Sequence, residues 1–253
     1  MVGYLAGGLI VHYAGFKTAF FTCGAIYLLS AILVHIFVKE NFNYTAAKKE
    51  KVRFSFKYLA NPAILWLLVM FLLMGIARRI EQPFLAMQVE LVHGKVGAAF
   101  YTGIISAAAA LGGVISGVAV GKLCDKYNPQ KLIVPIIIFS AAFTLGQAFS
   151  CNIIMLIIAR FFTYFAAGGL QPVLQVILAK TTSAELRGTF FGWSGGINTA
   201  GGIVCSFLSG SLVLLTGVRS IFVAAAVILL LICIPYCFFS KTEKSGTIDK
   251  SEV

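Results

Sequence analysis

The fold follows from one stretch, GLIVHYAGFKTAF at residues 8–20, because a related stretch, GSLVLLTGVRSIF, returns at residues 210–222. In each stretch an apolar, glycine-containing helix ends at a Gly-x-basic turn, and another apolar helix follows at once. The turns are Gly15-Phe16-Lys17 and Gly217-Val218-Arg219. The two copies indicate equivalent helical hairpins in two parallel halves of one architecture. The alternative interpretation is chance similarity between two glycine-rich hairpins.

The composition is that of an integral membrane protein. Hydrophobic residues make up 59% of the 253 residues and charged residues 11%, and the mean hydropathy is +0.94. A membrane-spanning helix needs about 20 mainly apolar residues and must satisfy its backbone internally. We therefore expect an all-α polytopic protein with about eight transmembrane helices, at residues 1–13, 18–38, 62–91, 98–120, 131–150, 152–179, 188–214 and 219–239.

The repeat and the polar stretch at residues 39–60 predict the domain organisation. If one half takes about 200 residues, this chain holds the end of a first half and all of a second. Because Met1 already lies in an apolar run, we expect an N-terminal truncation that leaves earlier helices out. The expected parts are the last two helices of a first bundle at 1–38, a cytoplasmic linker at 39–60, a complete second six-helix bundle at 61–240 and a cytoplasmic tail at 241–253.

The net charge of +11 predicts orientation in the membrane and not nucleic-acid binding. Most basic residues lie in segments 39–57, 122–131, 180–187 and 241–250, which share one side if the helices alternate. The opposite connections hold only Lys17, Lys95 and Arg219. By the positive-inside rule the crowded side is cytoplasmic. We expect a multi-pass protein of the cell membrane, with the lipid bilayer as a partner and its basic loops and tail in the cytoplasm.

Enzyme chemistry is not indicated. The six cysteines are scattered without metal-ligand spacing, and the three histidines form no cluster. We predict no catalytic residue, no metal site and no bound cofactor.

The third predicted helix carries four polar residues where lipid would disfavour them: Arg78, Arg79, Glu81 and Gln82. Charges at that depth normally face a cavity or a partner. Glu81 can pair with Arg78 one turn earlier, and Pro83 should bend or break the helix just beyond. In one interpretation these four residues line a cavity. In the other, their charged groups extend to the lipid headgroups on the outer side of the membrane.

The sixth predicted helix presents one polar stripe. At 100° per residue, Arg160, Tyr164, Gly168, Gln171 and Gln175 fall on one side of an otherwise apolar helix. So long a stripe is not expected to face lipid. It predicts either the lining of a water-accessible path or a polar helix interface.

Two helices carry glycines at four-residue spacing, which lets helix backbones approach closely in lipid. The glycines face a sliding partner during gating in one interpretation and pack statically in the other. They are Gly113, Gly117 and Gly121 in the fourth helix, and Gly188, Gly192 and Gly196 in the seventh.

The connection at residues 121–131, GKLCDKYNPQK, resembles the signature loop of the major facilitator superfamily in its second-half copy. Gly121, Asp125 and Lys126 match, and Lys131 matches after one insertion, but the second glycine of the signature is replaced near Asn128-Pro129. The resemblance implies a cytoplasmic gate in which Asp125 changes partners. Glu185 and Arg187, at the entry to the next helix, resemble further gate residues of the family.

Other segments carry the same resemblance across essentially the whole chain. Residues 160–169, RFFTYFAAGG, are similar to the Arg-x-x-x-Gly-x-x-x-Gly pattern of the family's fourth helix in each half, with Tyr164 replacing the first glycine. Gly3-Tyr4-Leu5-Ala6-Gly7-Gly8 resembles a drug:proton antiporter signature in which Tyr4 replaces a proline. The resemblance implies that the helices correspond to helices 5–12 of the fold, and that the polar third and sixth helices line the cavity.

These observations predict a secondary active transporter of small molecules, multidrug-efflux-like, that works by alternating access. The expected partners are a small-molecule substrate, protons and the missing N-terminal helices. The expected cavity residues are Arg78, Arg79, Glu81, Gln82, Arg160, Tyr164, Gln171 and Gln175. If protons drive transport, Glu81 is the best visible carrier. Two alternatives stay open: uptake or exchange of an organic anion, which the excess of arginine in the cavity favours, and a non-transporting fragment.

Overall fold

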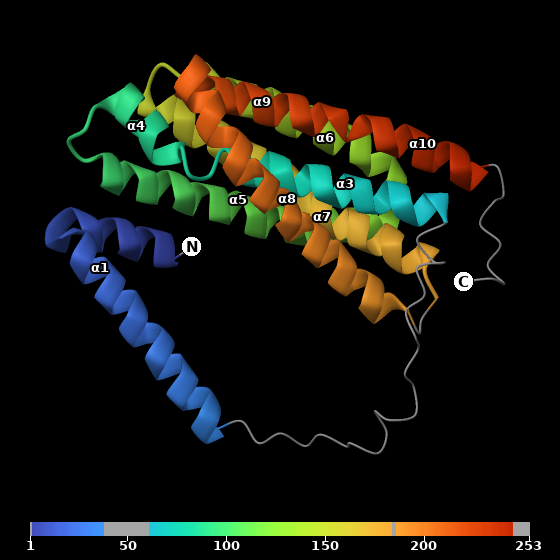
Figure 1. Cartoon of the computed structure of the whole chain (residues 1–253), viewed down its shortest axis with the longest axis horizontal. Helices are drawn as coiled ribbons and strands as arrows, with labels where there is room; N and C mark the ends of the chain where they lie inside the picture. Colours follow the sequence, from blue (N-terminus) through green and yellow to red (C-terminus); the bar gives the residue numbers. More distant parts are fainter. Residues whose placement is uncertain (1, 38–60, 184–185, 245–253) are drawn as a thin grey trace.

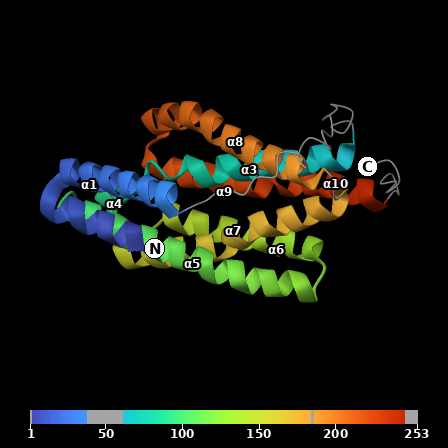
Figure 2. The same ribbon diagram turned by 90° about the horizontal axis from the view of Figure 1, so that it is seen from below.

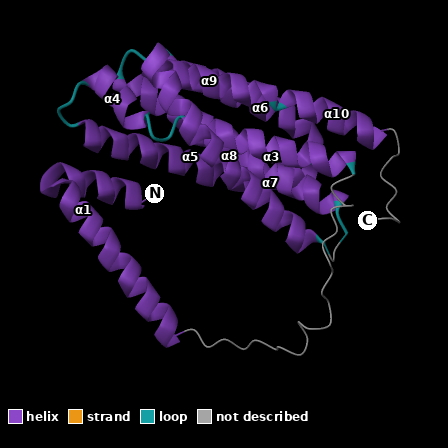
Figure 3. Cartoon of the chain, in the orientation of Figure 1, coloured by secondary structure: helices purple, strands orange, loops and turns teal. Residues whose placement is uncertain are grey.

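The computed structural model describes residues 2–37, 61–183 and 186–244 of the chain. These ranges contain helices and short connections but no strand (Figure 1, Figure 3). The helices are α1 Val2–Phe37, α3 Pro62–Ile80, α4 Leu85–His93, α5 Ala98–Lys126, α6 Pro129–Ala148, α7 Ile153–Thr181, α8 Arg187–Thr216, α9 Val218–Leu231 and α10 Cys233–Lys244. The predicted all-α fold class is confirmed. The expected linker at 39–60 lies outside the described residues, as does most of the expected tail.

Asparagine side chains begin three of these helices. Asn61 accepts a hydrogen bond from the Ala63 amide at 3.0 Å, and Asn152 accepts one from the Met155 amide at 2.7 Å. Asn128 does the same for α6, at 3.1 Å from the Gln130 amide. Each cap satisfies an amide that has no partner inside its helix, so the polar residue between two apolar runs fixes where the second run becomes helical.

Prolines interrupt two of the predicted helices. The predicted break at Pro83 is confirmed, because α3 ends at Ile80 and α4 begins at Leu85. The last predicted helix, 219–239, is also divided, into α9 and α10 at Ile232. Pro235 explains this second break, since its ring would clash with the carbonyl of Leu231 and it has no amide hydrogen to donate.

The two glycine turns of the repeat share one backbone conformation. Gly15 has φ 79° and ψ 170°, and Gly217 has φ 85° and ψ 171°. Only glycine adopts this region readily. Gly15 bends α1 into two arms (Figure 1), which correspond to the first two predicted helices. Seven stretches of the described residues are long and apolar enough to cross a membrane, with Ala6–Phe37 taken as one.

A buried apolar core holds α3, α7 and α8 together. Phe71, Leu174 and Phe190 are buried in it, and α6, α9 and α10 also contribute side chains. Helix α5 packs along α7, and α1 packs against α5 (Figure 1, Figure 2). At that last contact the Gly8 backbone lies so close that a Cβ there would be 3.1 Å from the Gly103 Cα.

Most of the glycines that the spacing predicted lie outside the close helix contacts of the described residues. A Cβ on Gly117, Gly188, Gly192 or Gly196 would meet no atom within 4 Å. A Cβ on Gly113 would likewise meet no atom within 4 Å. The Cα of Gly113, however, lies 3.1 Å from the position that a Cβ on Gly168 of α7 would take. The tight approach of α5 to α7 instead uses Gly112, where a Cβ would lie 2.5 Å from the Phe161 carbonyl oxygen. A four-residue spacing identifies a small-residue face, but only tertiary packing decides which face meets a neighbour.

Candidate functional site

A buried ion pair lies at the break between α3 and α4. Glu81 follows the last residue of α3, and its Oε1 lies 2.6 Å from Nη1 of Arg160 on α7. Both side chains are 3% exposed. The predicted pairing of Glu81 with Arg78 is therefore wrong. Glu81 is the C-cap residue of α3 and still has helical backbone angles, but its carboxylate reaches Arg160 on α7 instead.

Gln147 of α6 completes the surroundings of this pair. Its Oε1 accepts a hydrogen bond from Arg160 Nη1 at 2.9 Å, and its Nε2 donates one to Thr163 Oγ1 at 2.8 Å. Its backbone carbonyl accepts from Gln88 Nε2 of α4 at 3.1 Å. Polar groups removed from water are costly unless they are hydrogen-bonded, so this network ties four helices together at one point.

The network leaves three buried atoms without a protein partner within the described part of the chain: Glu81 Oε2, Gln88 Oε1 and Arg160 Nε. A carboxylate oxygen without a hydrogen-bond partner can bind a proton or accept a hydrogen bond from water. The unpartnered Oε2 is therefore the position at which Glu81 can take up a proton.

Tyr164 lies between two guanidinium groups. Its ring centroid is 4.8 Å from Cζ of Arg160 and 5.8 Å from Cζ of Arg78. Arg160 Nη2 also donates a hydrogen bond to the Tyr164 hydroxyl at 3.3 Å. Cation–π contacts of this kind are stronger where water is excluded, and they connect the buried pair to the exposed surface of the site.

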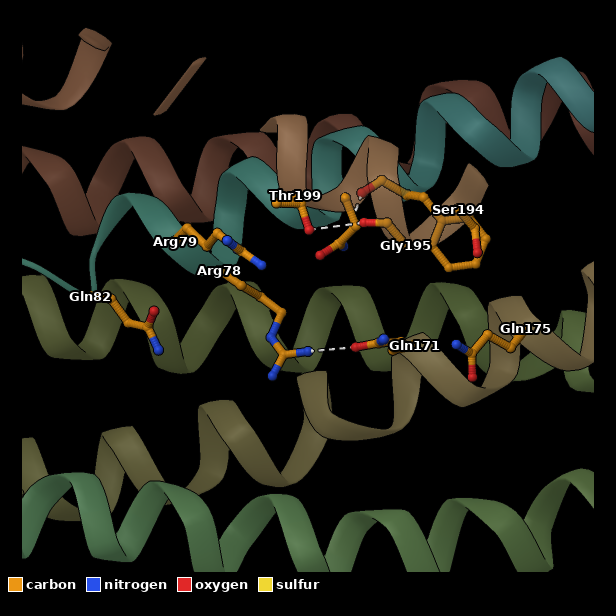
Figure 4. A pocket seen from close by; sticks show the side chains of 10 residues that line it. Arg78, Arg79, Gln82, Gln171, Gln175, Ser194, Gly195 and Thr199 are labelled. Atoms are coloured by element: carbon orange, nitrogen blue, oxygen red, sulfur yellow. Dashed lines mark hydrogen bonds between the residues drawn. The ribbon is translucent and has the colours of Figure 1, made fainter. Parts of the chain in front are cut away.

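A polar cavity of about 420 Å³ adjoins this cluster, between α3, α7 and α8 (Figure 4). Inside it Arg78 Nη1 donates a hydrogen bond to Gln171 Oε1 at 3.1 Å. Arg79 and Gln82 come from the same end of α3 as Arg78. The lining residues are Phe71, Arg78, Arg79, Gln82, Gln171, Gln175, Ser194, Gly195, Asn198 and Thr199.

A second cavity, of about 600 Å³, lies between α3, α4, α5 and α7 and is more apolar. It shares Arg78 and Gln82 with the polar cavity. Its walls combine Arg160 and Tyr164 with hydroxyl and aliphatic groups. These are Pro83, Leu85, Ala86, Thr102, Ser106, Ala109, Ala110 and Gly113.

The structure thus brings together seven of the eight residues expected in the cavity. Five of them line the polar cavity: Arg78, Arg79, Gln82, Gln171 and Gln175. Arg160 and Tyr164 line the second one. Glu81 lines neither and lies behind them, paired to Arg160.

The expected gate residues are less fully described. Glu185 and the side chain of Asp125 lie outside the described residues. Gly121 and Lys126 belong to the end of α5, which extends beyond its predicted end at 120. Lys126 Nζ lies 5.6 Å from the Tyr127 ring centroid, and Arg187 Nε donates to the Ala179 carbonyl at 3.0 Å. The described contacts of Lys126 and Arg187 are therefore local and do not join one gate residue to another.

Several residues of the site were not predicted. Gln147 could have been found, because Ser140, Thr144 and Gln147 recur at helical spacing in α6 and are all buried. Ser194, Asn198 and Thr199 line the polar cavity from α8, where the glycine pattern was taken as a packing signal only. Polar residues between those glycines are the sequence signal for a cavity wall.

Comparison with known proteins gives two kinds of match. The sequence model of the Major Facilitator Superfamily matches residues 1–153 and 102–252. The Multidrug resistance protein MdtG of Escherichia fergusonii is 28% identical over 236 residues, which cover 91% of this chain and 57% of that protein. The protein of the same name from Klebsiella pneumoniae is 27% identical over 234 residues, with 91% and 57% covered. The chain thus spans little more than half the length of these relatives.

A solved structure supports the fold. The crystal structure of a bacterial homolog of the human lysosomal transporter Spinster, inward-facing and unoccupied, superposes with a TM-score of 0.61. It is 17% identical in sequence, and the match covers 96% of this chain and 65% of that one. At this identity the likeness concerns the arrangement of helices alone.

Proposed function

This chain belongs to the major facilitator superfamily, and on that premise we propose that it moves small organic molecules across a membrane by alternating access, as a multidrug-efflux-like transporter. The chain is a multi-pass membrane protein. The observation that carries the proposal is the pair of adjoining cavities at Arg78, lined by polar side chains on helices that are otherwise apolar. Polar side chains inside a membrane are costly, and they mark solute paths when they surround a cavity.

In the proposed arrangement, α3 to α10 form one helical bundle and the two arms of α1 belong to another. The matched conformations of Gly15 and Gly217 support this assignment, since equivalent turns of two repeats should share their backbone geometry. The contact between α1 and α5 would then be a contact between bundles. Transport would follow from the rocking of one bundle against the other around the cavities.

Proton coupling is the second part of the proposal, with Glu81 as the carrier. Its Oε1 is held by Arg160 and its Oε2 has no protein partner. Protonation at Oε2 would weaken the ion pair and release Arg160 toward the cavity that it lines with Tyr164. The location of the protein in the cell membrane, with its basic connections in the cytoplasm, completes the proposal.

Counterflow in proteoliposomes tests whether the chain is a carrier. The full chain is reconstituted, and the vesicles are loaded with excess unlabelled 4-phenylbutanesulfonate or 4-phenylbutyltrimethylammonium, permanently charged probes that cross lipid slowly. A carrier takes up the labelled form of at least one probe against its gradient for a short time. Protein-free vesicles are the control, and uptake no greater than theirs for both probes would refute the proposed function.

A further inference from the structure

We propose that the substrate of this site is an amphipathic organic anion, whose charged group binds Arg78 and Arg79 and whose apolar body occupies the second cavity. This inference rests on the proposed function and names its substrate class. It follows from the charge, the free bonding capacity and the shape of the two cavities.

The charge of the site is positive. Among the described residues no aspartate or glutamate lines either cavity, whereas Arg78, Arg79 and Arg160 do. Glu81 lines neither cavity and already neutralises Arg160. A site with two uncompensated arginines favours an anion and repels a cation.

The arginines that remain are available for binding. The Arg160–Glu81 contact is the one ion pair among residues 2–37, 61–183 and 186–244. Arg78 donates to a neutral amide, that of Gln171. Arg79 makes no hydrogen bond or ion pair with any other residue in the described ranges. Figure 4 shows both side chains directed into the space between α3, α7 and α8.

The neighbours of these arginines suit an anionic group. Gln82, Gln171 and Gln175 present amide groups to the same cavity, and amide N–H groups can donate alongside a guanidinium. Guanidinium groups bind carboxylate, sulfonate and phosphonate oxygens through paired N–H donors. The polar cavity therefore offers both charge and hydrogen bonds to one compact anionic group.

The second cavity supplies the apolar part of the site. It begins at the same Arg78 and Gln82, so one molecule can extend from the polar cavity into it. Its wall includes Leu85, Ala109 and the Tyr164 ring. Volumes of about 420 and 600 Å³ are those of pockets that enclose small organic molecules.

Binding to the full chain in phosphatidylcholine nanodiscs tests the proposal. Isothermal titration compares 4-phenylbutanesulfonate with its cationic analogue 4-phenylbutyltrimethylammonium and with neutral 4-phenylbutanol. We expect the sulfonate to bind at least about tenfold more tightly than either analogue, since a charged hydrogen bond contributes that much. Equal affinity for the three probes, tighter binding of the cation, or no binding by a helical, monodisperse sample would overturn the proposal.

Variants locate the charge. Arg79→Gln removes a guanidinium that makes no hydrogen bond or ion pair with another described residue, and we expect sulfonate affinity to fall about tenfold or more while 4-phenylbutanol affinity is unchanged. Arg79→Lys should recover part of the loss. Arg219→Gln is the matched control, because it removes the same charge from an exposed turn outside both cavities. An equal effect of Arg219→Gln and Arg79→Gln would contradict the assignment.

A lipid phosphate has the same chemistry as the proposed group, and a change of lipid separates the two sources. In nanodiscs containing phosphatidylglycerol, a lipid ligand would compete with the probe. A loss of sulfonate affinity greater than about tenfold, beyond the effect of the negative surface, would assign the arginines to lipid and overturn the proposal. Sulfonate binding without counterflow would instead refute the proposed function and leave the charge preference of the site intact.

Discussion

The positively charged guanidinium of Arg160 lies in the interior of the bundle. It donates hydrogen bonds to three oxygen atoms: Glu81 Oε1, Gln147 Oε1 and the Tyr164 hydroxyl. A buried ion pair is weak evidence for stability, because the cost of removing both charges from water offsets their attraction. Retaining such a pair next to a cavity therefore points to a role beyond folding. The unpartnered Glu81 Oε2 is consistent with protonation as that role.

A double-mutant cycle tests this interpretation of the pair. Arg160→Gln leaves Glu81 buried and unpaired, and we expect it to lower the free energy of unfolding by about 3–5 kcal/mol. Glu81→Gln combined with Arg160→Gln should restore a substantial part of that loss, because two amides can bond to each other without a buried charge. Both values come from the loss of helical circular dichroism as dodecyl sulfate is added to micelles. A loss in the double variant equal to the sum of the losses in the Arg160→Gln and Glu81→Gln variants would show that the two residues do not interact.

At the scale of the helices, the sequence predicted local features, such as helix breaks and turns, better than it predicted contacts between helices. Pro83 predicted the break after α3, and the glycines of the repeat predicted the bend of α1 and the α8–α9 turn. Each depends on the backbone chemistry of one or two residues. The partner of Glu81 could not be derived in this way, since it comes from α7 and depends on where α3 ends.

The same distinction explains the glycine faces and the cavity wall. Gly112 and Gly113 are neighbours in sequence and point about 100° apart on the helix, yet only a Cβ on Gly112 would collide with α7. Gln171 and Gln175 of the predicted stripe line the polar cavity, whereas the α8 residues opposite them were not expected. A stripe indicates which side of a helix is polar, and the facing helix must be found from the packing.

The Gly217 turn yields a prediction at this scale. Gly217→Ala places a Cβ at φ 85° and ψ 171°, a conformation that costs non-glycine residues about 1–3 kcal/mol. We expect the free energy of unfolding in the same titration to fall by that amount. Gly210→Ala is the matched control, because Gly210 lies within α8 with no atom within 4 Å of a Cβ, so its substitution should be neutral or slightly stabilising. If both variants unfolded alike, the turn would not depend on glycine.

At the scale of the whole molecule, the family and the fold are established while the orientation is a proposal. The described basic connections, at residues 122–131 and 180–183, lie at one end of the alternating helices, and Cys151 lies in the connection between α6 and α7, at the opposite end. Cys151 is exposed, and Tyr127 is exposed in the basic connection between α5 and α6.

Cysteine labelling in intact cells checks this orientation. A variant that retains only Cys151, and a cysteine-free variant that carries Tyr127→Cys, are treated with a maleimide that does not cross membranes. We expect Cys151 to be labelled from outside, and the thiol at position 127 to be labelled only after the cells are opened. Labelling at position 127 in intact cells, with Cys151 protected, would reverse the proposed topology.

The central claim is that the cluster at Arg78, Glu81 and Arg160 couples movement of a solute to movement of protons. The measurement that tests it most directly is uptake of labelled 4-phenylbutanesulfonate into proteoliposomes of the full chain under an imposed pH gradient, beside the Glu81→Gln variant. We expect wild-type uptake to follow the direction of the gradient, and Glu81→Gln to bind the probe but show no gradient-driven uptake. Gradient-driven uptake by Glu81→Gln at the wild-type rate would contradict the claim.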